Sequence, residues 1–98
     1  MDGMTLSTHV LDTERGRPAT GVRVELFDAD GDLVGDGVTD TDGRIKELGA
    51  AHAGTYRIVF HPPSPFFKRV ELEVELGEGH HHVPLLVSSY ACASYRGS

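Results

Sequence analysis

Three polar residues, His9, Arg44 and His82, each lie in a stretch of alternating residues, on the face opposite their aliphatic neighbours. Successive side chains of a strand point to opposite faces of a sheet, so we expect all three on outer sheet faces. A histidine there titrates near neutral pH and can act as a general acid or base. An arginine offers a fixed fork of donors to a carbonyl or a developing oxyanion. These residue types fit acid–base chemistry at a carbonyl, provided that the fold brings them together.

The last five residues, 94–98, combine a tyrosine, an arginine, a glycine and two serines directly after an aliphatic run. The ends of most domains are poorly ordered unless something ties them down. On these residues alone, a charged end to the last strand is the simpler interpretation. A tail that reaches a functional site is the alternative.

Two groups of residues suggest metal binding, and both are incomplete. His80 and His82 have the i, i+2 spacing of a chelating pair, but structural zinc sites take four ligands and no cysteine pair accompanies them. Residues 28–32 resemble a calcium loop but lack its twelfth-position glutamate and its flanking helices. We therefore predict no metal and no other cofactor. The single cysteine, Cys92, is interpreted as a small packing residue.

Composition limits the class of protein. The 98 residues suffice for one domain, 1–98, with its own core, and the apolar content of 39% is ordinary for a soluble domain. The net charge of −6 argues against a nucleic-acid partner. No run approaches the about 18 apolar residues of a membrane span, and the N-terminus lacks the pattern of a signal peptide. Together with the single cysteine, these features predict a cytoplasmic protein without a membrane partner.

The elements that must position the candidate residues are strands. Short alternating stretches are separated by turn signals such as Asp42-Gly43 and by the proline-rich residues 61–65, and no segment has a helical period. The pattern predicts an all-β sandwich. The expected strands are 5–12, 22–26, 33–39, 44–48, 55–60, 67–76, 80–87 and 90–96.

Five motifs occur in order along the chain: LSTHVLD at 6–12, GRPA at 16–19, TDGRI at 41–45, HHHVPLL at 80–86 and SYRGS at 94–98. With them the sequence resembles the transthyretin-like 5-hydroxyisourate hydrolases from residue 6 to residue 98. The final tetrapeptide separates these enzymes from the transthyretins. The resemblance implies a transthyretin-like sandwich of two four-stranded sheets. It also implies a homotetramer in which subunits pair edge to edge and the dimers stack around a channel that holds the active sites.

The resemblance further implies a reaction in urate degradation. Water attacks a ring carbonyl of 5-hydroxyisourate and opens the cyclic amide, giving 2-oxo-4-hydroxy-4-carboxy-5-ureidoimidazoline, without a metal or organic cofactor. The hypothesis for the roles is that His9 deprotonates the water, Arg44 stabilises the oxyanion, and His82 and Ser98 hold the water or the ring. The implied catalytic residues are His9, Arg44, His82 and Ser98, and the implied substrate-binding residues are Tyr95, Arg96 and Gly97.

The sequence departs from the family pattern in two places that affect structure. His81 stands where an aromatic is usual, and we expect it to face the core side with Val83 as a neutral, hydrogen-bonded histidine. Residues 60–67 are too few for the short helix that family members commonly place there, so we expect no helix. Two alternatives stay open. One is a carrier that binds a small aromatic ligand in the central channel, and the other is a hydrolase for a related cyclic ureide.

Overall fold

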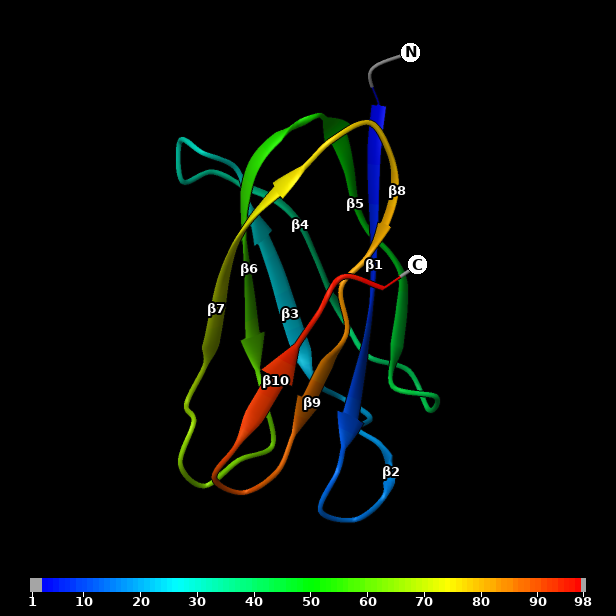
Figure 1. The fold of residues 1–98 in the computed structure, drawn as a ribbon, viewed down its shortest axis with the longest axis vertical. Coiled ribbons are helices and arrows are strands. Elements are labelled where there is room, and N and C mark those ends of the chain that lie inside the picture. Colours follow the sequence, from blue (N-terminus) through cyan, green and yellow to red (C-terminus); the bar gives the residue numbers. More distant parts are fainter. Residues whose placement is uncertain (1–2, 98) are drawn as a thin grey trace.

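The computed structural model describes residues 3–97, which form ten strands and no helix (Figure 1). None of these residues belongs to a helix long and apolar enough to cross a membrane. The strands are β1 (Gly3–Asp12), β2 (Arg17–Pro18), β3 (Arg23–Phe27), β4 (Leu33–Val38), β5 (Arg44–His52), β6 (Gly54–His61), β7 (Val70–Leu76), β8 (Gly79–His82), β9 (Leu85–Val87) and β10 (Cys92–Ser94).

The strands form two sheets, as predicted. One sheet has the order β4-β3-β6-β7 and is antiparallel throughout. The other is built on β1, which pairs with β5 and then β2 on one side and with β8 and then β9 on the other. β10 adds outside β9. Because β2 continues the place of β5 and β9 continues that of β8, this sheet is also four strands wide, although it counts six elements.

The core lies between the two sheets and follows the alternation of the strands. On β1, Leu6, Thr8 and Val10 are buried on the inner face. Phe60 of β6 is the largest side chain that is fully buried within the described residues. Each such aliphatic or aromatic side chain contributes about 1.5–3 kcal/mol when it leaves water. The other face of β1 is therefore available for polar side chains.

Several strand predictions need correction, and two of them concern the neighbours of β1. Residues 80–87 were expected to form one strand, but the pairing breaks at Val83 and Pro84 because proline has no N–H to donate. The break is bridged by Thr8, whose hydroxyl donates to the carbonyl of Val83 over 2.6 Å. Residues 49–54 were interpreted as a connection, but β5 extends to His52 and β6 begins at Gly54. Pairing of β5 with the first residues of β1 supports this extension.

The connection between β6 and β7 has no helix, as predicted. The hydroxyl of Ser64 accepts hydrogen bonds from the N–H groups of Phe66 and Phe67 and donates to the carbonyl of Ser89. These bonds tie the connection to the loop between β9 and β10. Phe67 thus belongs to this connection, and β7 begins at Val70 rather than at residue 67 as predicted.

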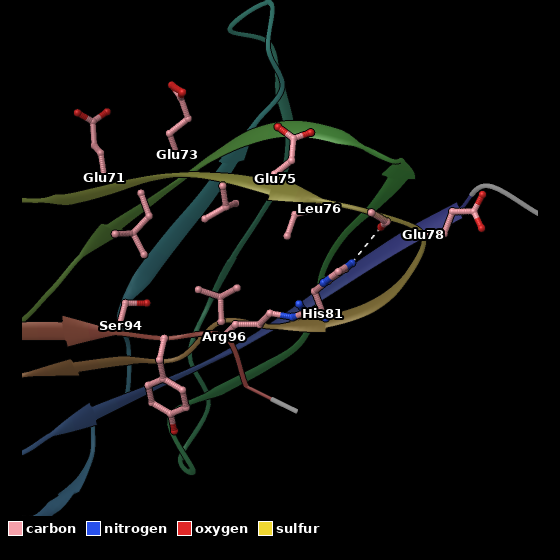
Figure 2. Close-up of a pocket in the computed structure, with 13 residues that line it drawn as sticks. Glu71, Glu73, Glu75, Leu76, Glu78, His81, Ser94 and Arg96 are labelled. Carbon is pink, nitrogen blue, oxygen red and sulfur yellow. Dashed lines mark hydrogen bonds between the residues drawn. The ribbon is translucent and has the colours of Figure 1, made fainter.

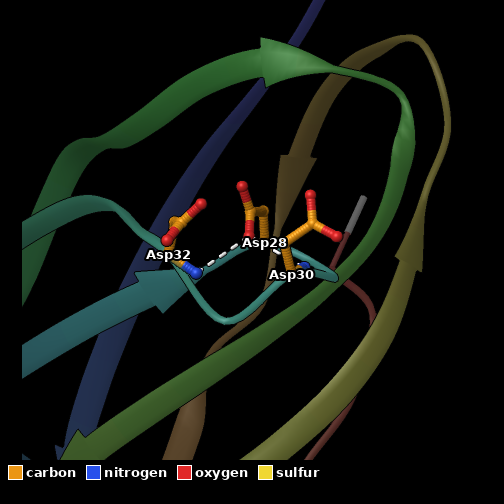
Figure 3. Close-up of side chains that lie close together, drawn as sticks. All are labelled: Asp28, Asp30 and Asp32. Carbon is orange, nitrogen blue, oxygen red and sulfur yellow. Dashed lines mark hydrogen bonds between the residues drawn. The ribbon is translucent and has the colours of Figure 1, made fainter.

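The acidic residues 28–32 form a turn. One carboxylate oxygen of Asp28 accepts the N–H groups of Asp30 and Asp32 at 3.0 and 2.9 Å (Figure 3). Gly31, with a φ of 86°, completes the turn between β3 and β4. The aspartate pattern is thus accounted for by turn chemistry. Cys92 is exposed on β10, so its interpretation as a packing residue was wrong.

The turn before β5 depends on Gly43, which gives the first testable prediction. Its φ is 75°, and an added Cβ would lie 2.5 Å from the carbonyl oxygen of Val10. We expect Gly43→Ala to lower the free energy of unfolding by about 1–3 kcal/mol, measured by urea denaturation. Gly77→Ala is the matched control, because no heavy atom lies within 4 Å of its added Cβ and its φ is not positive. Equal stability losses in the two variants would contradict the steric argument.

Candidate active site

The pairing of β1 with its neighbours gathers the candidate residues on one sheet face. Ser7 lies opposite His82 on β8, and His9 lies opposite Arg44 on β5. Ser7 and His9 alternate with the buried Leu6, Thr8 and Val10, so they point away from the core. The structure therefore brings three of the residues predicted from sequence, His9, Arg44 and His82, to the same outer face.

A single turn orients both His9 and Arg44. One carboxylate oxygen of Asp40 accepts the N–H groups of Asp42 and Arg44 at 2.9 and 3.0 Å. These hydrogen bonds, that from Arg44 above all, lower the pKa of Asp40 below its ordinary value. The ring Nε2 of His9 donates to the carbonyl oxygen of Asp42 over 2.8 Å. Because a carbonyl only accepts, this bond leaves Nδ1 as the basic nitrogen of neutral His9.

Lys46 of β5 adds a further cation to the site, next to a register shift in this strand. Leu6 pairs with Gly49, whereas Thr8 pairs with Ile45, so β5 accommodates three residues where β1 has one. Lys46 lines the same cavity as Arg44. The sequence analysis did not select Lys46, although its i+2 spacing from Arg44 was a signal that could have found it.

The cavity at this face has a volume of about 390 Å³. Its polar and charged lining comes from β1, β5 and β8. The pKa of His82 is lowered, first by burial and then by the positive charges of Arg44, His9 and His80. The neutral imidazole of His82 is therefore favoured at neutral pH, which suits a general base. The lining residues are Ser7, Thr8, Arg44, Ile45, Lys46, His80 and His82.

The C-terminal tail reaches this site through its backbone. After β10 the chain runs beside β8, and the N–H of Gly97 donates to the carbonyl of His82 over 2.7 Å (Figure 1). Ser98, predicted to be catalytic, lies outside the described residues. Tyr95 and Arg96 line a different cavity, between β7 and β8, so their role in binding substrate stays a prediction.

The close approach of the tail leads to a second prediction. A Cβ added to Gly97 would lie 2.8 Å from Cδ2 of His82 and 3.0 Å from its carbonyl oxygen. Either the tail or the imidazole must move, and displacement of a reacting group by about 1 Å can cost about a hundredfold in rate. We expect Gly97→Ala to lower kcat at least about tenfold while the thermal midpoint stays within about 2 °C of wild type. Ala93→Ser, an exposed change on β10, is the control. An unchanged kcat in Gly97→Ala would contradict the close contact between the tail and His82.

The second cavity, of about 720 Å³, opens between the edges of the two sheets (Figure 2). Its apolar wall includes Leu72, Val74 and Val83, while the glutamates of β7 alternate with them and point to solvent. His81 lines it with Val83 and donates from Nε2 to the carbonyl of Gly77 over 2.9 Å. His81 is thus hydrogen-bonded and shares a cavity with Val83, as expected from alternation.

Comparison with known proteins places this geometry in a family. A model of the HIUase/Transthyretin family matches residues 6–97. The chain belongs to this family. A 5-hydroxyisourate hydrolase of Deinococcus radiodurans is 41% identical, over 95% of both chains. The 5-hydroxyisourate hydrolase 2 of Rhizobium meliloti is 40% identical, also over 95% of both chains.

Two solved structures, one of an enzyme and one of a transthyretin complex, resemble this chain. The 5-hydroxyisourate hydrolase of Klebsiella pneumoniae has a TM-score of 0.86 and 36% identity, over 97% of this chain and 99% of that one. Sea bream transthyretin in complex with thyroxine has a TM-score of 0.83 and 28% identity, over 94% of this chain and 93% of that one. The fold is therefore shared by both kinds of protein, and the side chains of the site must distinguish them.

Three residues at this site were missed or misinterpreted from the sequence. Lys46 and Ser7 were not selected, and His80 was considered only as a metal ligand. The hydroxyl of Ser7 lies 3.0 Å from Nε2 of His80 and 2.8 Å from Nδ1 of His82. The chain pairs β1 with β8 in parallel although the strands are more than 70 residues apart. No local sequence pattern reports such a pairing.

Proposed function

We propose that this protein hydrolyses 5-hydroxyisourate to 2-oxo-4-hydroxy-4-carboxy-5-ureidoimidazoline in urate degradation. The observation that supports this most strongly is the convergence of His9, Arg44 and His82 on one face, beside a cavity of about 390 Å³. The identity of the substrate is inferred from the relatives named 5-hydroxyisourate hydrolase. No metal or organic cofactor is required by the proposed chemistry.

In the proposed mechanism, His82 is the general base. The sequence hypothesis gave this role to His9, but it is His82 rather than His9 that lines the cavity of about 390 Å³. The lowered pKa of His82 keeps its imidazole ready to accept a proton at neutral pH. Its Nδ1 is bonded to Ser7, so Nε2 is the nitrogen that would take a proton from the attacking water.

The cations beside His82 fit the charge that develops during ring opening. When water attacks a ring carbonyl, negative charge appears on the carbonyl oxygen, and the guanidinium of Arg44 would donate hydrogen bonds to it. Lys46 adds a second positive charge at the same cavity. The proton taken by the base then returns to the departing ring nitrogen, and the cyclic amide bond opens.

The alternative of a non-catalytic carrier has less support from the site. A binder of an aromatic ligand needs an apolar cavity with few orienting polar groups. The cavity here is lined by two cations and two histidines, and one of those histidines has a lowered pKa. Such a lining suits a reaction with charge development better than simple storage of an aromatic molecule.

The experiment that tests the function generates 5-hydroxyisourate from urate with urate oxidase and follows the decay of its ultraviolet absorbance. The enzyme hypothesis predicts decay faster than the spontaneous reaction and many product molecules per subunit. A non-catalytic carrier would instead slow the decay of 5-hydroxyisourate, or would remove no more than one molecule of it per binding site. Decay at the spontaneous rate would contradict the proposal.

We also propose a homotetramer in which subunits pair edge to edge and dimers stack around a channel. Within residues 3–97, β7 pairs only with β6, which leaves a seven-residue edge beside the cavity of about 720 Å³. An exposed strand edge of this kind is a template for pairing with another chain. Gly97 already bonds to His82 within one subunit, whereas the proposed binding role of Tyr95 and Arg96 depends on stacked dimers that bring them near substrate. Light scattering after gel filtration tests this, and an active monomer would contradict it.

A cytoplasmic location is part of the same proposal. The described structure has one cysteine, Cys92, which is exposed and unpaired. Exposed thiols persist in reducing compartments, where disulfides are rare. Fractionation of cells that produce the protein tests this location.

A further inference from the structure

A chain of side-chain hydrogen bonds joins the exposed edge of the site to its proposed base. The hydroxyl of Thr5 lies 2.7 Å from Nδ1 of His80, and that of Ser7 lies 3.0 Å from Nε2 of the same ring. Ser7 also lies 2.8 Å from Nδ1 of His82. The register of β1 and β8 creates the chain, because Thr5 is opposite His80 and Ser7 is opposite His82.

This chain has two self-consistent directions when both histidines are neutral. Each ring nitrogen either donates or accepts, and a hydroxyl has one proton to donate. In one direction Nδ1 of His82 donates to Ser7, Ser7 donates to Nε2 of His80, and Nδ1 of His80 donates to Thr5. This arrangement leaves Nε2 of His82 unprotonated, as a base requires. In the reverse direction every bond switches and Nε2 of His82 carries a proton.

The surroundings of Ser7 favour its participation in this chain. Its exposure is 8%, so water has little access to compete for the hydroxyl proton. Within residues 3–97, the Ser7 hydroxyl forms hydrogen bonds with two side chains, the imidazoles of His80 and His82. A buried hydroxyl between two rings is well placed to pass a proton from one to the other.

The environment of His82 favours proton transfer in one direction, from His82 to His80. The groups that face His82 are Arg44 and Lys46 from β5, His9 from β1 and His80 on its own strand. Burial and the fixed charge of Arg44 disfavour a positive charge on His82. His80 is exposed at the rim of the cavity, whereas His82 is half-buried. A proton taken up by His82 therefore gains by moving outward to His80.

We propose that Ser7 and His80 are positioning residues that hold His82 in its basic tautomer and relay its proton outward. Water gives a proton to Nε2 of His82, and its oxygen bonds to the ring carbonyl carbon. The Nδ1 proton of His82 passes to Ser7, whose own proton passes to Nε2 of His80. His80 becomes an imidazolium that still donates to Thr5. The reverse transfer returns the proton to the departing ring nitrogen. This inference rests on the proposed hydrolase function.

The first test uses kinetics on 5-hydroxyisourate. We expect Ser7→Ala to lower kcat about ten- to a hundredfold with KM within about twofold, because relay and tautomer are lost while substrate contacts remain. Ser7→Thr keeps the hydroxyl and should recover most of kcat. His61→Gln, an exposed histidine on the opposite sheet, is the control and should leave kcat unchanged. Equal kcat values for wild type and Ser7→Ala would overturn the relay.

The second test separates the relay from a merely structural role. When His80 carries a proton, its charge lowers the pKa of His82, and His80→Gln removes that charge. The acid limb of the kcat/KM profile should therefore move to higher pH in this variant while kcat falls. Nitrogen-15 NMR should find the Nδ1–H tautomer of His82 in wild type and its loss in Ser7→Ala. An Nε2–H tautomer in wild type would overturn the proposed arrangement. The NMR result does not depend on turnover, whereas an inactive wild type would instead reject the hydrolase function.

Discussion

Replacing Arg44 with alanine is expected to lower kcat for 5-hydroxyisourate about a hundred- to a thousandfold. The guanidinium lies at the cavity beside His82 and is the strongest donor available for an oxyanion there. Within residues 3–97, its side chain makes no ion pair, and β5 is held by the backbone N–H of Arg44 on Asp40. The variant should therefore fold normally, with an unchanged thermal midpoint.

Arg44→Lys is the matched variant for this prediction. Lysine keeps the charge but lacks the planar fork, so it should restore only part of the lost rate. The measurement is the initial rate of absorbance decay at saturating 5-hydroxyisourate. Arg44→Ala with a wild-type kcat would remove Arg44 from the mechanism and leave Lys46 as the alternative donor.

The second large effect is expected for His82→Gln. Loss of a general base typically costs about a hundred- to ten-thousandfold in rate, and glutamine cannot accept the proton. In wild type, His82 is inactive when protonated, so kcat/KM should rise as pH increases through its lowered pKa. The midpoint of this acid limb should lie below about 6.5, the ordinary value for histidine. His82→Gln should lose most of the catalytic rate, and its kcat/KM profile should lack this acid limb.

His9→Gln is the comparison that decides between the two histidines. Because His82 rather than His9 lines the cavity, we expect a smaller rate loss than for His82→Gln and a retained acid limb. A limb that disappears in His9→Gln and persists in His82→Gln would return the base role to His9. The pH–rate profiles of the three proteins provide this measurement.

The alternation of β1 explains how much of the site could be predicted. Leu6 and Val10 identify the inner face by their burial preference, so the outward direction of Ser7 and His9 follows from a period of two. Strand existence and the two-layer architecture follow from the same pattern. The local sequence does not show which strands lie side by side, because the pairing of β1 with β8 spans most of the chain.

Some of the features that were missed depend on tertiary geometry, and others were readable from the sequence. The bulge in β5 that accompanies Lys46 arises from a register shift against β1, which no residue type in 46–48 announces. The break at Pro84 was readable in principle, since proline cannot continue a ladder. The separation of Tyr95 and Arg96 from His82 depends on how the tail passes β8, and only Gly97 of the described tail bonds to it.

The most direct test of the site compares wild type with an Arg44→Ala, His82→Gln double variant at matched folded concentration. Freshly generated 5-hydroxyisourate is mixed with each protein, and its absorbance decay is followed beside a protein-free sample. We predict a wild-type rate that grows in proportion to enzyme concentration and a double-variant rate equal to the spontaneous decay. A wild type no faster than buffer, or a double variant as fast as wild type, would contradict the assignment of hydrolysis to this face of the sheet.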